Sequence, residues 1–551
     1  MLEAELDSIL YDARNHHQAG RFTDAQKLYE KFLTLKPNIA EVQSKLGAAL
    51  AAQGKFKQSI SILNKAIENA PNLTDAYINL GGVLHIQGDT EGAIDLFKRA
   101  IELDPNQISA HINLGNTFLR QEDLDGATNA YTLALRIDSN SHEALNGLAS
   151  TKMKNNNFEE ASNLFKRALA NSQNQPETLC NYGILLRNQG KFEESEKTLR
   201  KALKIKPKSV EFHINLGNTL KSRRKLDDAM ESYQQAISLD PNNADAHWNK
   251  AQILLMLGNL EEGWREYEWR TKCSEFQLLI WRPGGPTWDG SDLNKKTILI
   301  YCEQGFGDSI QFIRYAQLIK KLGARIIVKC QPKLKSLFET MPEIERTITR
   351  SDKTTAYHFQ ASILSLPYLI KTTPETIPSE VPYLFLPEKK YDGLIRNGKL
   401  NVGIVWSGSP SHKNDQHRSM SLKNFQPLFD AKNFNFYSLQ FGERNQDIIS
   451  FGFTDVLKSL EEDLDGFWAT ALVLKKLDLI ISVDTSTAHL AGALGKPVWN
   501  LLSFVPDWRW MLDREDSPWY PSMRLFRQNT PGDWLSVIKN VKYALENEFP
   551  N

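Results

Sequence analysis

The sequence is poor in cysteine, balanced in charge and free of long apolar runs. Its four cysteines (Cys180, Cys273, Cys302 and Cys330) have no spacing typical of a zinc site, and so few of them suit a reducing compartment. Lysine plus arginine equals aspartate plus glutamate at 66 each, so no net field attracts nucleic acid or an anionic membrane. No stretch approaches 18 apolar residues, and residues 1–17 lack the apolar centre of a secretory signal. We therefore expect a cytoplasmic protein with no membrane span and no nucleic-acid partner.

A 34-residue period runs through the first half of the chain. Prolines recur at one phase, small residues at two further phases, and a large apolar residue at a fourth. The members are Pro37, Pro71, Pro105, Pro207 and Pro241; Gly47, Gly81, Gly115, Gly183 and Gly217; Ala25, Ser59, Ala93, Ala127, Ala161, Ser195, Ala229 and Gly263; and Tyr29, Leu63, Phe97, Tyr131, Phe165, Leu199, Tyr233 and Tyr267. Small residues let two antiparallel helices approach closely, the large residue fills the space between hairpins, and proline ends the second helix. The pattern resembles the tetratricopeptide family over residues 6 to about 271, which implies an all-α superhelix of about seven and a half repeats in residues 1–271.

A polar residue follows the same period, two residues before the first small-residue phase. It is asparagine at five repeats, interrupted by Lys45 and Gly147: Asn79, Asn113, Asn181, Asn215 and Asn249. A carboxamide donates and accepts hydrogen bonds, so a row of them on the concave groove can bind the backbone of an extended peptide. The row resembles the asparagine ladder of the O-GlcNAc transferase repeat domain, which implies an acceptor polypeptide in the groove. The alternative is that these asparagines satisfy local groups on a solvated wall.

After Tyr267 the period ends and apolar strands alternate with helices. Residues 272–296, which include a stretch rich in glycine, proline and polar residues, are interpreted as a linker or collar. We expect strands at 297–302, 325–330, 361–367, 400–408, 434–441, 478–484 and 497–502, one helix over 309–323, and a last helix over 532–548 that covers a face of one lobe. This order predicts two Rossmann-like α/β lobes, 297–388 and 389–551, the architecture of the B-type glycosyltransferase fold (GT-B). Topology alone does not decide the function, because the same lobes serve other nucleotide enzymes.

The first motif of this half, EQGFGDSIQF (303–312), places Gly305, Gly307 and Asp308 between a strand and a helix, where open α/β sheets bind ligands. It lacks both G-x-G-x-x-G and a Walker lysine, which argues against a dinucleotide fingerprint and a P-loop. The second motif, VDTSTAHLAGALGKPVW (483–499), has a strand that ends at Asp484 and a helix that opens nearby. The helix N–H groups and the neighbouring side chains suit a pyrophosphate; these side chains are Thr485, Ser486, Thr487 and His489. The alternative for the hydroxyls is plain helix capping.

Together the two motifs resemble the heptosyltransferase family over residues 297 to 545. The resemblance implies that Asp308 is the catalytic base, which takes the proton of the acceptor hydroxyl, and that residues 484–487 hold the donor phosphates. It also implies a basic residue in WSGSPSHKNDQHRS (406–419) that neutralises the leaving diphosphate. Lys413 and Arg418 are the candidates, and Arg418 is favoured because a guanidinium can chelate two phosphate oxygens. The repeats and segment 504–528 depart from heptosyltransferases, and the whole is more similar to bacterial repeat-containing protein glycosyltransferases, including those that modify flagellin.

Three charged motifs are given ordinary interpretations. Asp123–Asp125 and Asp463–Asp465 imitate the D-x-D metal motif, but the first lies inside a repeat and Asp465 is expected to cap a helix, so no metal site is predicted. The basic cluster of residues 221–225 is expected to form a solvated edge of the array.

The leading hypothesis is a metal-independent glycosyltransferase that needs no cofactor besides its nucleotide-sugar co-substrate and modifies a hydroxyl of a protein held by the repeats. One alternative is an enzyme with a glycan acceptor, and another is a non-catalytic scaffold with a degenerate α/β half. The sequence leaves open the sugar, the nucleotide base, the acceptor, inversion or retention, and association into a homo-oligomer.

Overall fold

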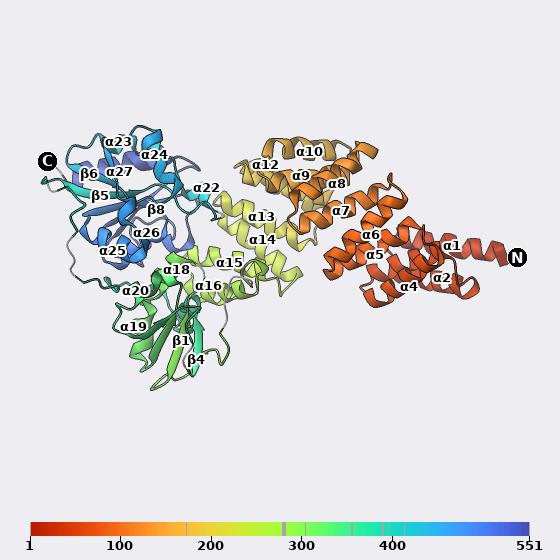
Figure 1. Ribbon diagram of the computed structural model, residues 1–551, viewed down its shortest axis with the longest axis horizontal. Coiled ribbons are helices and arrows are strands. Elements are labelled where there is room, and N and C mark those ends of the chain that lie inside the picture. The colour runs from red at the N-terminus through yellow and green to blue at the C-terminus, as the bar shows by residue number, and fades with distance from the viewer. Residues whose placement is uncertain are drawn as a thin grey trace. The chain divides into compact units, whose positions relative to one another are not determined.

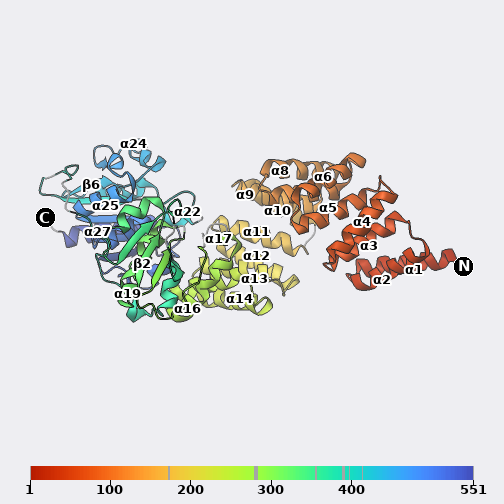
Figure 2. The ribbon, with the colours of Figure 1, turned by 60° about the horizontal axis from the view of Figure 1, so that its bottom comes forward.

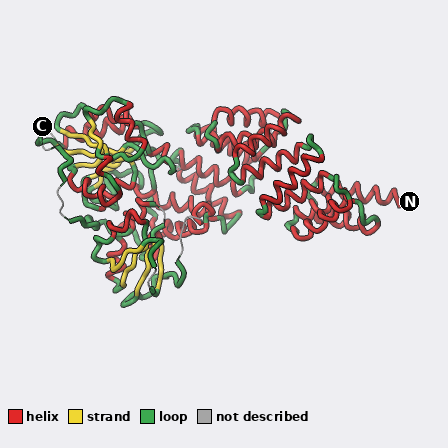
Figure 3. Tube along the Cα trace, viewed as in Figure 1, coloured by secondary structure: helices red, strands yellow, loops and turns green. Residues whose placement is uncertain are grey.

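The structure is a computed structural model that describes residues 2–171, 174–277, 283–303, 305–353, 356–387, 391–395, 397–412 and 414–549. The chain divides into two compact units, residues 1–219 and 220–551. Strands occur in two separate groups within the second unit (Figure 3).

Antiparallel helix pairs form the first half of the chain (Figures 1 and 2). The helices are α1 (Leu2–Gln18), α2 (Phe22–Leu35), α3 (Ala40–Ala52), α4 (Phe56–Asn69), α5 (Thr74–Gln87), α6 (Thr90–Leu103), α7 (Ile108–Arg120), α8 (Leu124–Ile137), α9 (His142–Lys154), α10 (Phe158–Asn171), α11 (Pro176–Asn188), α12 (Phe192–Ile205), α13 (Val210–Ser222), α14 (Leu226–Leu239), α15 (Ala244–Met256) and α16 (Leu260–Tyr267). The last helix is shortened and continues as a 3-10 turn over Glu268–Lys272. These pairs confirm the predicted tetratricopeptide-like array, although its end belongs to the second compact unit.

The small and large phases of the period meet inside each hairpin. A Cβ atom on Gly81 would lie 2.7 Å from Phe97, and one on Gly115 would lie 2.7 Å from Tyr131, so the ring occupies the space of the missing side chain. Phe97 and Tyr131 are fully buried. Glycine is therefore required at these positions by the close approach of the two helices.

Each proline of the period has a hydrogen-bond partner that was not predicted from the sequence. Six residues after the proline, a polar side chain at the start of the next helix donates a hydrogen bond to the proline carbonyl. The pairs are Gln43 to Pro37 (2.8 Å), Tyr77 to Pro71 (3.0 Å), His111 to Pro105 (3.0 Å), His213 to Pro207 (2.9 Å) and His247 to Pro241 (3.1 Å). These bonds tie the turn after one hairpin to the first helix of the next, and satisfy carbonyls that no helix bond can reach.

The second unit contains two parallel sheets. The strands are β1 (Thr297–Tyr301), β2 (Arg325–Lys329), β3 (Ile344–Ile348), β4 (Phe359–Ser362), β5 (Leu400–Val405), β6 (Phe434–Ser438), β7 (Leu457–Ser459), β8 (Leu479–Val483), β9 (Val498–Leu502) and β10 (Met523–Arg527). The first sheet has the order β3-β2-β1-β4 and the second β10-β9-β8-β5-β6-β7. In each sheet the strand order reverses beside the first strand of the lobe, between β1 and β4 and between β5 and β8, and such switch points are where open α/β sheets bind ligands.

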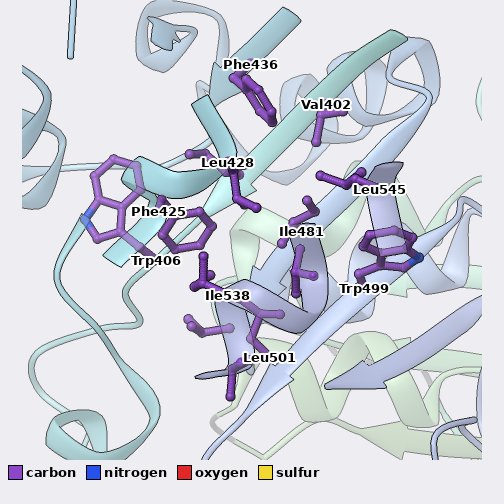
Figure 4. Packing of buried hydrophobic residues seen from close by; sticks show 14 of the residues in the cluster. Val402, Trp406, Phe425, Leu428, Phe436, Ile481, Trp499, Leu501, Ile538 and Leu545 are labelled. Atoms are coloured by element: carbon purple, nitrogen blue, oxygen red, sulfur yellow. The ribbon is translucent and has the colours of Figure 1, made fainter. Parts of the chain in front are cut away.

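The remaining helices of the second unit precede, connect or follow the strands of the two sheets. They are α17 (Ser274–Gln277), α18 (Phe306–Phe312), α19 (Tyr315–Lys321), α20 (Lys335–Phe338), α21 (Leu366–Leu369), α22 (Asp415–Arg418), α23 (Gln426–Phe429), α24 (Asp447–Ser450), α25 (Gly466–Lys476), α26 (Ser486–Ala493) and α27 (Trp534–Glu548). As predicted, the last helix covers one face of the second sheet. Ile538 and Leu545 pack with Ile481, Trp499 and other buried strand residues (Figure 4).

Two local predictions in the first lobe are wrong. The strand expected at 361–367 is β4, which ends at Ser362, and residues 363–369 are helical. The single helix expected at 309–323 is interrupted between α18 and α19. There the Nε of Arg314 donates to the Gln311 carbonyl (2.8 Å), which the Tyr315 N–H would need in a continuous helix.

Arg314 also joins distant parts of the second unit. It is 1% exposed, and its guanidinium donates to the carbonyls of Pro378 (3.0 Å) and Trp519 and to the Tyr383 hydroxyl (2.9 Å). The ring of Tyr520 lies 4.4 Å from its central carbon. One buried side chain thus connects α18 and α19 with residues 378–383 and with segment 504–528.

Three strands, β3, β7 and β10, were not predicted. In the collar, the Trp288 N–H donates to the Gln360 carbonyl (2.8 Å), so this segment extends along the edge strand β4.

Among the helices of the described residues, none combines the length and apolarity that crossing a membrane requires.

Candidate functional site

The two predicted motifs lie together because α18 and α26 contact each other. A Cβ atom on Gly307 would lie 3.0 Å from the ring of His489, so a larger residue would force the helices apart. Both helices begin at the carboxyl end of a strand, α18 after β1 and α26 after β8 (Figure 1). The groups predicted for the base and for the donor phosphates therefore belong to one site.

Asp308 lies in the first turn of α18 and is 35% exposed. Its Oδ1 accepts a hydrogen bond from Arg509 Nη2 at 2.5 Å. Its Oδ2 lies against Gly305, where any side chain would overlap it. Burial raises the pKa of Asp308 above its ordinary value, while the Arg509 guanidinium acts to lower it. The carboxyl thus has one oxygen bound and one oxygen beside a glycine.

The second lobe contributes Arg418 and Asp484. Arg418, at the end of α22, donates to the Asp484 carbonyl (3.2 Å) and approaches Asp415 Oδ1 (3.4 Å). The Asp484 side chain is 18% exposed. Burial and the nearby Asp507 raise the pKa of Asp484 to about 6, against the lowering effect of Trp510 and Arg418. Arg418 is therefore placed beside the strand end from which α26 starts. Lys413, the other basic candidate, lies outside the described residues.

The start of α26 has no side-chain cap. Thr485 occupies the N-cap position, but its hydroxyl pairs with that of Ser482 (3.0 Å) and not with a helix N–H. Ser486 and Thr487 are half-buried in the first turn. The first N–H groups of this helix thus lack the capping bond that the alternative interpretation requires, which favours an anion site.

His489 is buried. Its Nδ1 shares a hydrogen bond with the Tyr520 hydroxyl (2.9 Å), and its ring stacks on Trp510 at 5.2 Å. Burial lowers the pKa of His489 well below its usual value, and Arg509 lowers it further. Its Nε2 lies 3.9 Å from Asp484 Oδ1, and burial of the ring favours the uncharged imidazole at this contact.

Sequence reasoning missed Arg509, which lies in a 3-10 turn over Trp508–Trp510. Its side chain is 8% exposed and donates to Asp308, to Asp507 Oδ1 (2.8 Å) and to Gln311 Oε1 (2.6 Å). A signal was available, because the W-R-W triplet stands in the segment that departs from the resembled family. An arginine between two tryptophans is typical of a guanidinium stacked on rings.

A second missed feature is a buried pair at the end of β1. Arg270, after the last repeat helix, is 2% exposed and bonds Glu303 Oε1 at 2.6 Å, and it also reaches Ser365 Oγ (2.9 Å). Glu303 in turn accepts from the Ser362 hydroxyl. The carboxylate nearest to Asp308 in sequence is therefore occupied by the end of the repeat array.

The asparagine ladder is half-buried and partly used between hairpins. An amide N–H donates to the residue 35 positions earlier at Asn79 (Ser44 Oγ, 3.0 Å), Asn181 (Asn146 Oδ1, 3.1 Å) and Asn215 (Cys180 Sγ, 3.5 Å). Asn249 instead donates to the Asp245 carbonyl (2.9 Å). At Asn113 the residue 35 positions earlier is Ile78, which offers no side-chain acceptor. Each of these bonds uses the side-chain N–H of the asparagine amide. Peptide binding by this row of asparagines stays a prediction.

The remaining charged motifs differ from one another. Asp123 caps α8 through the Gly126 N–H (2.9 Å), whereas Asp465 precedes α25 without a side-chain capping bond, contrary to expectation. The predicted solvated edge is wrong for Arg224, which lies 3.7 Å from Asp513 and 5.2 Å from the Phe504 ring. Over the ranges that the structure describes, no three His, Cys, Asp or Glu side chains gather as metal ligands would.

Comparison with known proteins supports the repeat half. Residues 39–253 match the family described as the C-terminal domain of cilia and flagella-associated protein 70. The chain is 26% identical over 322 residues to Protein FlbA of Caulobacter vibrioides (strain ATCC 19089 / CIP 103742 / CB 15). That similarity covers 53% of each protein, so the chain spans about half the length of this curated relative.

Solved structures resemble part of the chain, with low overall similarity. The Cut9–Hcn1 tetramer of the APC/C matches 48% of this chain and 53% of its own, with 21% identity and a TM-score of 0.43. YrrB is described as a TPR protein with an unusual peptide-binding site; the match covers 33% of this chain and 95% of YrrB, with 24% identity and a TM-score of 0.27. The match to yeast Tom70 covers 50% of this chain and 61% of Tom70, with 20% identity and a TM-score of 0.38. The helix pairs and the family match over residues 39–253 together show a tetratricopeptide-like repeat region, which an α/β region of two parallel sheets follows.

Proposed function

We propose that the protein transfers a sugar from a nucleotide-activated donor to a hydroxyl of a polypeptide. The observation that carries the proposal is the uncapped start of α26 beside Arg418, within the same site as Asp308. An anionic diphosphate suits the helix N–H groups and the guanidinium, and a partly exposed carboxylate is suited to accept a proton.

In the proposed reaction, the acceptor oxygen forms a bond to the anomeric carbon while the bond from that carbon to the phosphate oxygen breaks. The acceptor proton moves to Asp308, and the nucleotide diphosphate leaves with the electron pair. Arg418 and the α26 N–H groups stabilise the charge that develops on the leaving phosphate. General-base catalysis of this kind contributes about 10²–10⁴ to the rate.

Flagellin is the acceptor class that the sequence resemblance suggests, and the repeats would hold the acceptor protein away from the reacting atoms. We therefore expect intact protein masses from cells that contain the gene to exceed those from cells without it by the mass of the sugar. Complementation with Asp308→Asn should not restore the difference, whereas Arg325→Gln, which changes an exposed ion pair, should restore it. Identical masses with and without the gene would contradict the proposal.

Donor binding is tested apart from turnover. We expect calorimetric titration of the full chain with UDP, GDP and ADP to show binding of at least one nucleotide. Arg418→Gln should weaken that binding roughly 10-fold or more, because it removes a charge-assisted contact. Asp308→Asn should bind with nearly unchanged affinity while nucleotide release falls by at least about 10²-fold. Unchanged binding in Arg418→Gln would remove Arg418 from the donor site.

A further inference from the structure

Arg509 fixes one oxygen of Asp308 and leaves the other beside a glycine. Its Nη2 binds Oδ1 at 2.5 Å, and Oδ2 lies against Gly305, in the space that a side chain at that position would occupy. A carboxylate whose oxygens accept no hydrogen bond from a fixed partner can rotate about its terminal bond, whereas a charge-assisted bond to Oδ1 holds the plane of the group. The geometry therefore distinguishes the two oxygens of Asp308.

The guanidinium is itself held on every side. Its Nε donates to Gln311 Oε1 at 2.6 Å, its Nη1 donates to Asp507 Oδ1 at 2.8 Å, and its central carbon lies 4.2 Å from the Trp508 ring. Gln311 stands on α18, one turn after Asp308, so one guanidinium clamps two side chains of that helix. The Arg509 side chain is 8% exposed, against 35% for Asp308, so the guanidinium is more deeply buried than the carboxyl group that it binds.

We infer that Arg509 is the positioning residue of the base: it binds Asp308 Oδ1 so that Oδ2 is presented to the acceptor hydroxyl. The inference rests on the proposed function, because it assumes that Asp308 takes a proton. In this arrangement Arg509 contacts neither Asp308 Oδ2 nor the acceptor oxygen, and it acts only through its bond to Oδ1. It also lies next to Trp508, which contacts Trp264 of the last repeat helix at 5.2 Å, so the base is braced against the end of the repeat array.

The pH dependence of the reaction separates positioning from mere packing. The charged and titratable groups that face Asp308 are Arg509, Asp507, Glu303, His412, Tyr267 and Cys302. Of these, Arg509 lowers the pKa of Asp308 and Asp507 raises it. Activity that needs the ionised base rises with pH through this pKa. Loss of the Arg509 charge should therefore move the acidic limb of the rate profile to higher pH, and loss of the Asp507 charge should move it to lower pH.

The test measures nucleotide release by the full chain from UDP-, GDP-, dTDP- and CMP-linked sugars between pH 4.5 and 8. Arg509→Gln should lower the rate about 10- to 10²-fold and shift the acidic limb upward, because a misplaced group costs this much without loss of binding. Arg509→Lys keeps the charge and should return the limb toward the wild-type pH. Asp507→Asn should shift the limb downward, and the exposed-pair variant Arg325→Gln should match the wild type. Tryptophan fluorescence and near-ultraviolet circular dichroism check that each variant is folded.

Equal rate losses in Arg509→Gln and Arg509→Lys with an unmoved limb would show a purely structural role and overturn the inference. An Arg509→Gln enzyme with wild-type rate and profile would overturn it as well. If Arg509→Gln does not fold, the downward shift in Asp507→Asn decides the question alone, and an unmoved limb there overturns the inference. Failure of the proposed function has a different signature, in which Asp308→Asn releases nucleotide as fast as the wild type.

Discussion

Replacement of Arg314 by methionine should destabilise the second unit strongly, although it exchanges a charged residue for an apolar one in the interior. Arg314 makes four hydrogen bonds, to three carbonyls and one hydroxyl, and is 1% exposed. Hydrogen bonds to a charged group contribute about 1.5–3 kcal/mol each. Methionine fills much of the volume of the Arg314 aliphatic chain but leaves the carbonyls of Gln311, Pro378 and Trp519 without the donor they have in the wild type.

The opposing effect is the desolvation of the guanidinium, which costs several kcal/mol in the folded state and which the variant avoids. Each carbonyl that stays buried without a donor nevertheless costs about 1–3 kcal/mol, so three such carbonyls outweigh this gain and leave a net loss of roughly 3–5 kcal/mol. We expect a loss of that size in the free energy of unfolding. It would be a large part of the ~5–15 kcal/mol by which folded domains are stable.

The chain offers a selective probe for this measurement. All 12 tryptophans lie between residues 248 and 534, within the second unit, so tryptophan fluorescence in a urea titration follows that unit without a signal from residues 1–219. The control is Arg325→Met, which breaks an ion pair with Glu345 whose members are 62% and 46% exposed, and should change the stability by less than about 0.5 kcal/mol. An Arg314→Met protein within about 1 kcal/mol of the wild type would refute the reasoning, since the orphaned carbonyls would then have found other donors.

Two further predictions concern titration and the repeats. The pKa of Asp484 is raised from 3.8 to about 6, so the folded state binds this proton more tightly and the free energy of unfolding falls as the pH rises from about 4 to about 6. Asp484→Asn should remove this fall and stabilise the second unit at pH 7 by roughly 1–3 kcal/mol, as seen in urea titrations at both pH values; a pH dependence that survives the substitution would contradict the assignment. In the array, Asn181→Ala loses its bond to Asn146 and should cost about 0.5–1.5 kcal/mol, whereas Asn113→Ala should cost little; equal helical melting curves for the two variants would show that the inter-hairpin bond contributes nothing.

The parts of the fold that could be predicted are those with local causes. Each hairpin of the array buries a small residue under a large one 16 positions later, as at Gly81 and Phe97, so the cause lies within one repeat. The strands β1, β2, β5, β6, β8 and β9 were found because they are short apolar runs. β3 and β7 were missed because most of their residues are charged or polar (IERTI and LKS), and β10 (MRLFR) was missed because two arginines interrupt its apolar residues. Pairing with neighbouring strands, more than their own pattern, makes these segments strands.

The candidate site also combines residues that local sequence identifies with residues that only distant contacts bring in. Asp308 and Asp484 could be found from their positions after apolar strands, and the structure brings their helices together through Gly307 and His489. Arg509 could not be paired with Asp308 from the sequence, because 201 residues separate them and no period connects them. The interruption after α18 was missed for a similar reason, since Arg314 competes for a helix carbonyl only in the presence of its distant partners.

The end of the repeat array has a consequence for how such chains can be rearranged by recombination. Trp264 and Tyr267 pack with Trp508, and Arg270 is bound to Glu303, so the last hairpin is a fixed component of the α/β half. A 34-residue unit inserted or deleted upstream of residue 220 would alter the length of the array and leave this joint intact. An exchange at the apparent repeat boundary near residue 271 would instead remove the aromatic residues that pack on the α/β half and leave the buried Glu303 carboxylate without its arginine. Variation in repeat number among related chains should therefore fall in the first unit, and a foreign array should be tolerated only when the hairpin of α15 and α16 is kept with the sheets.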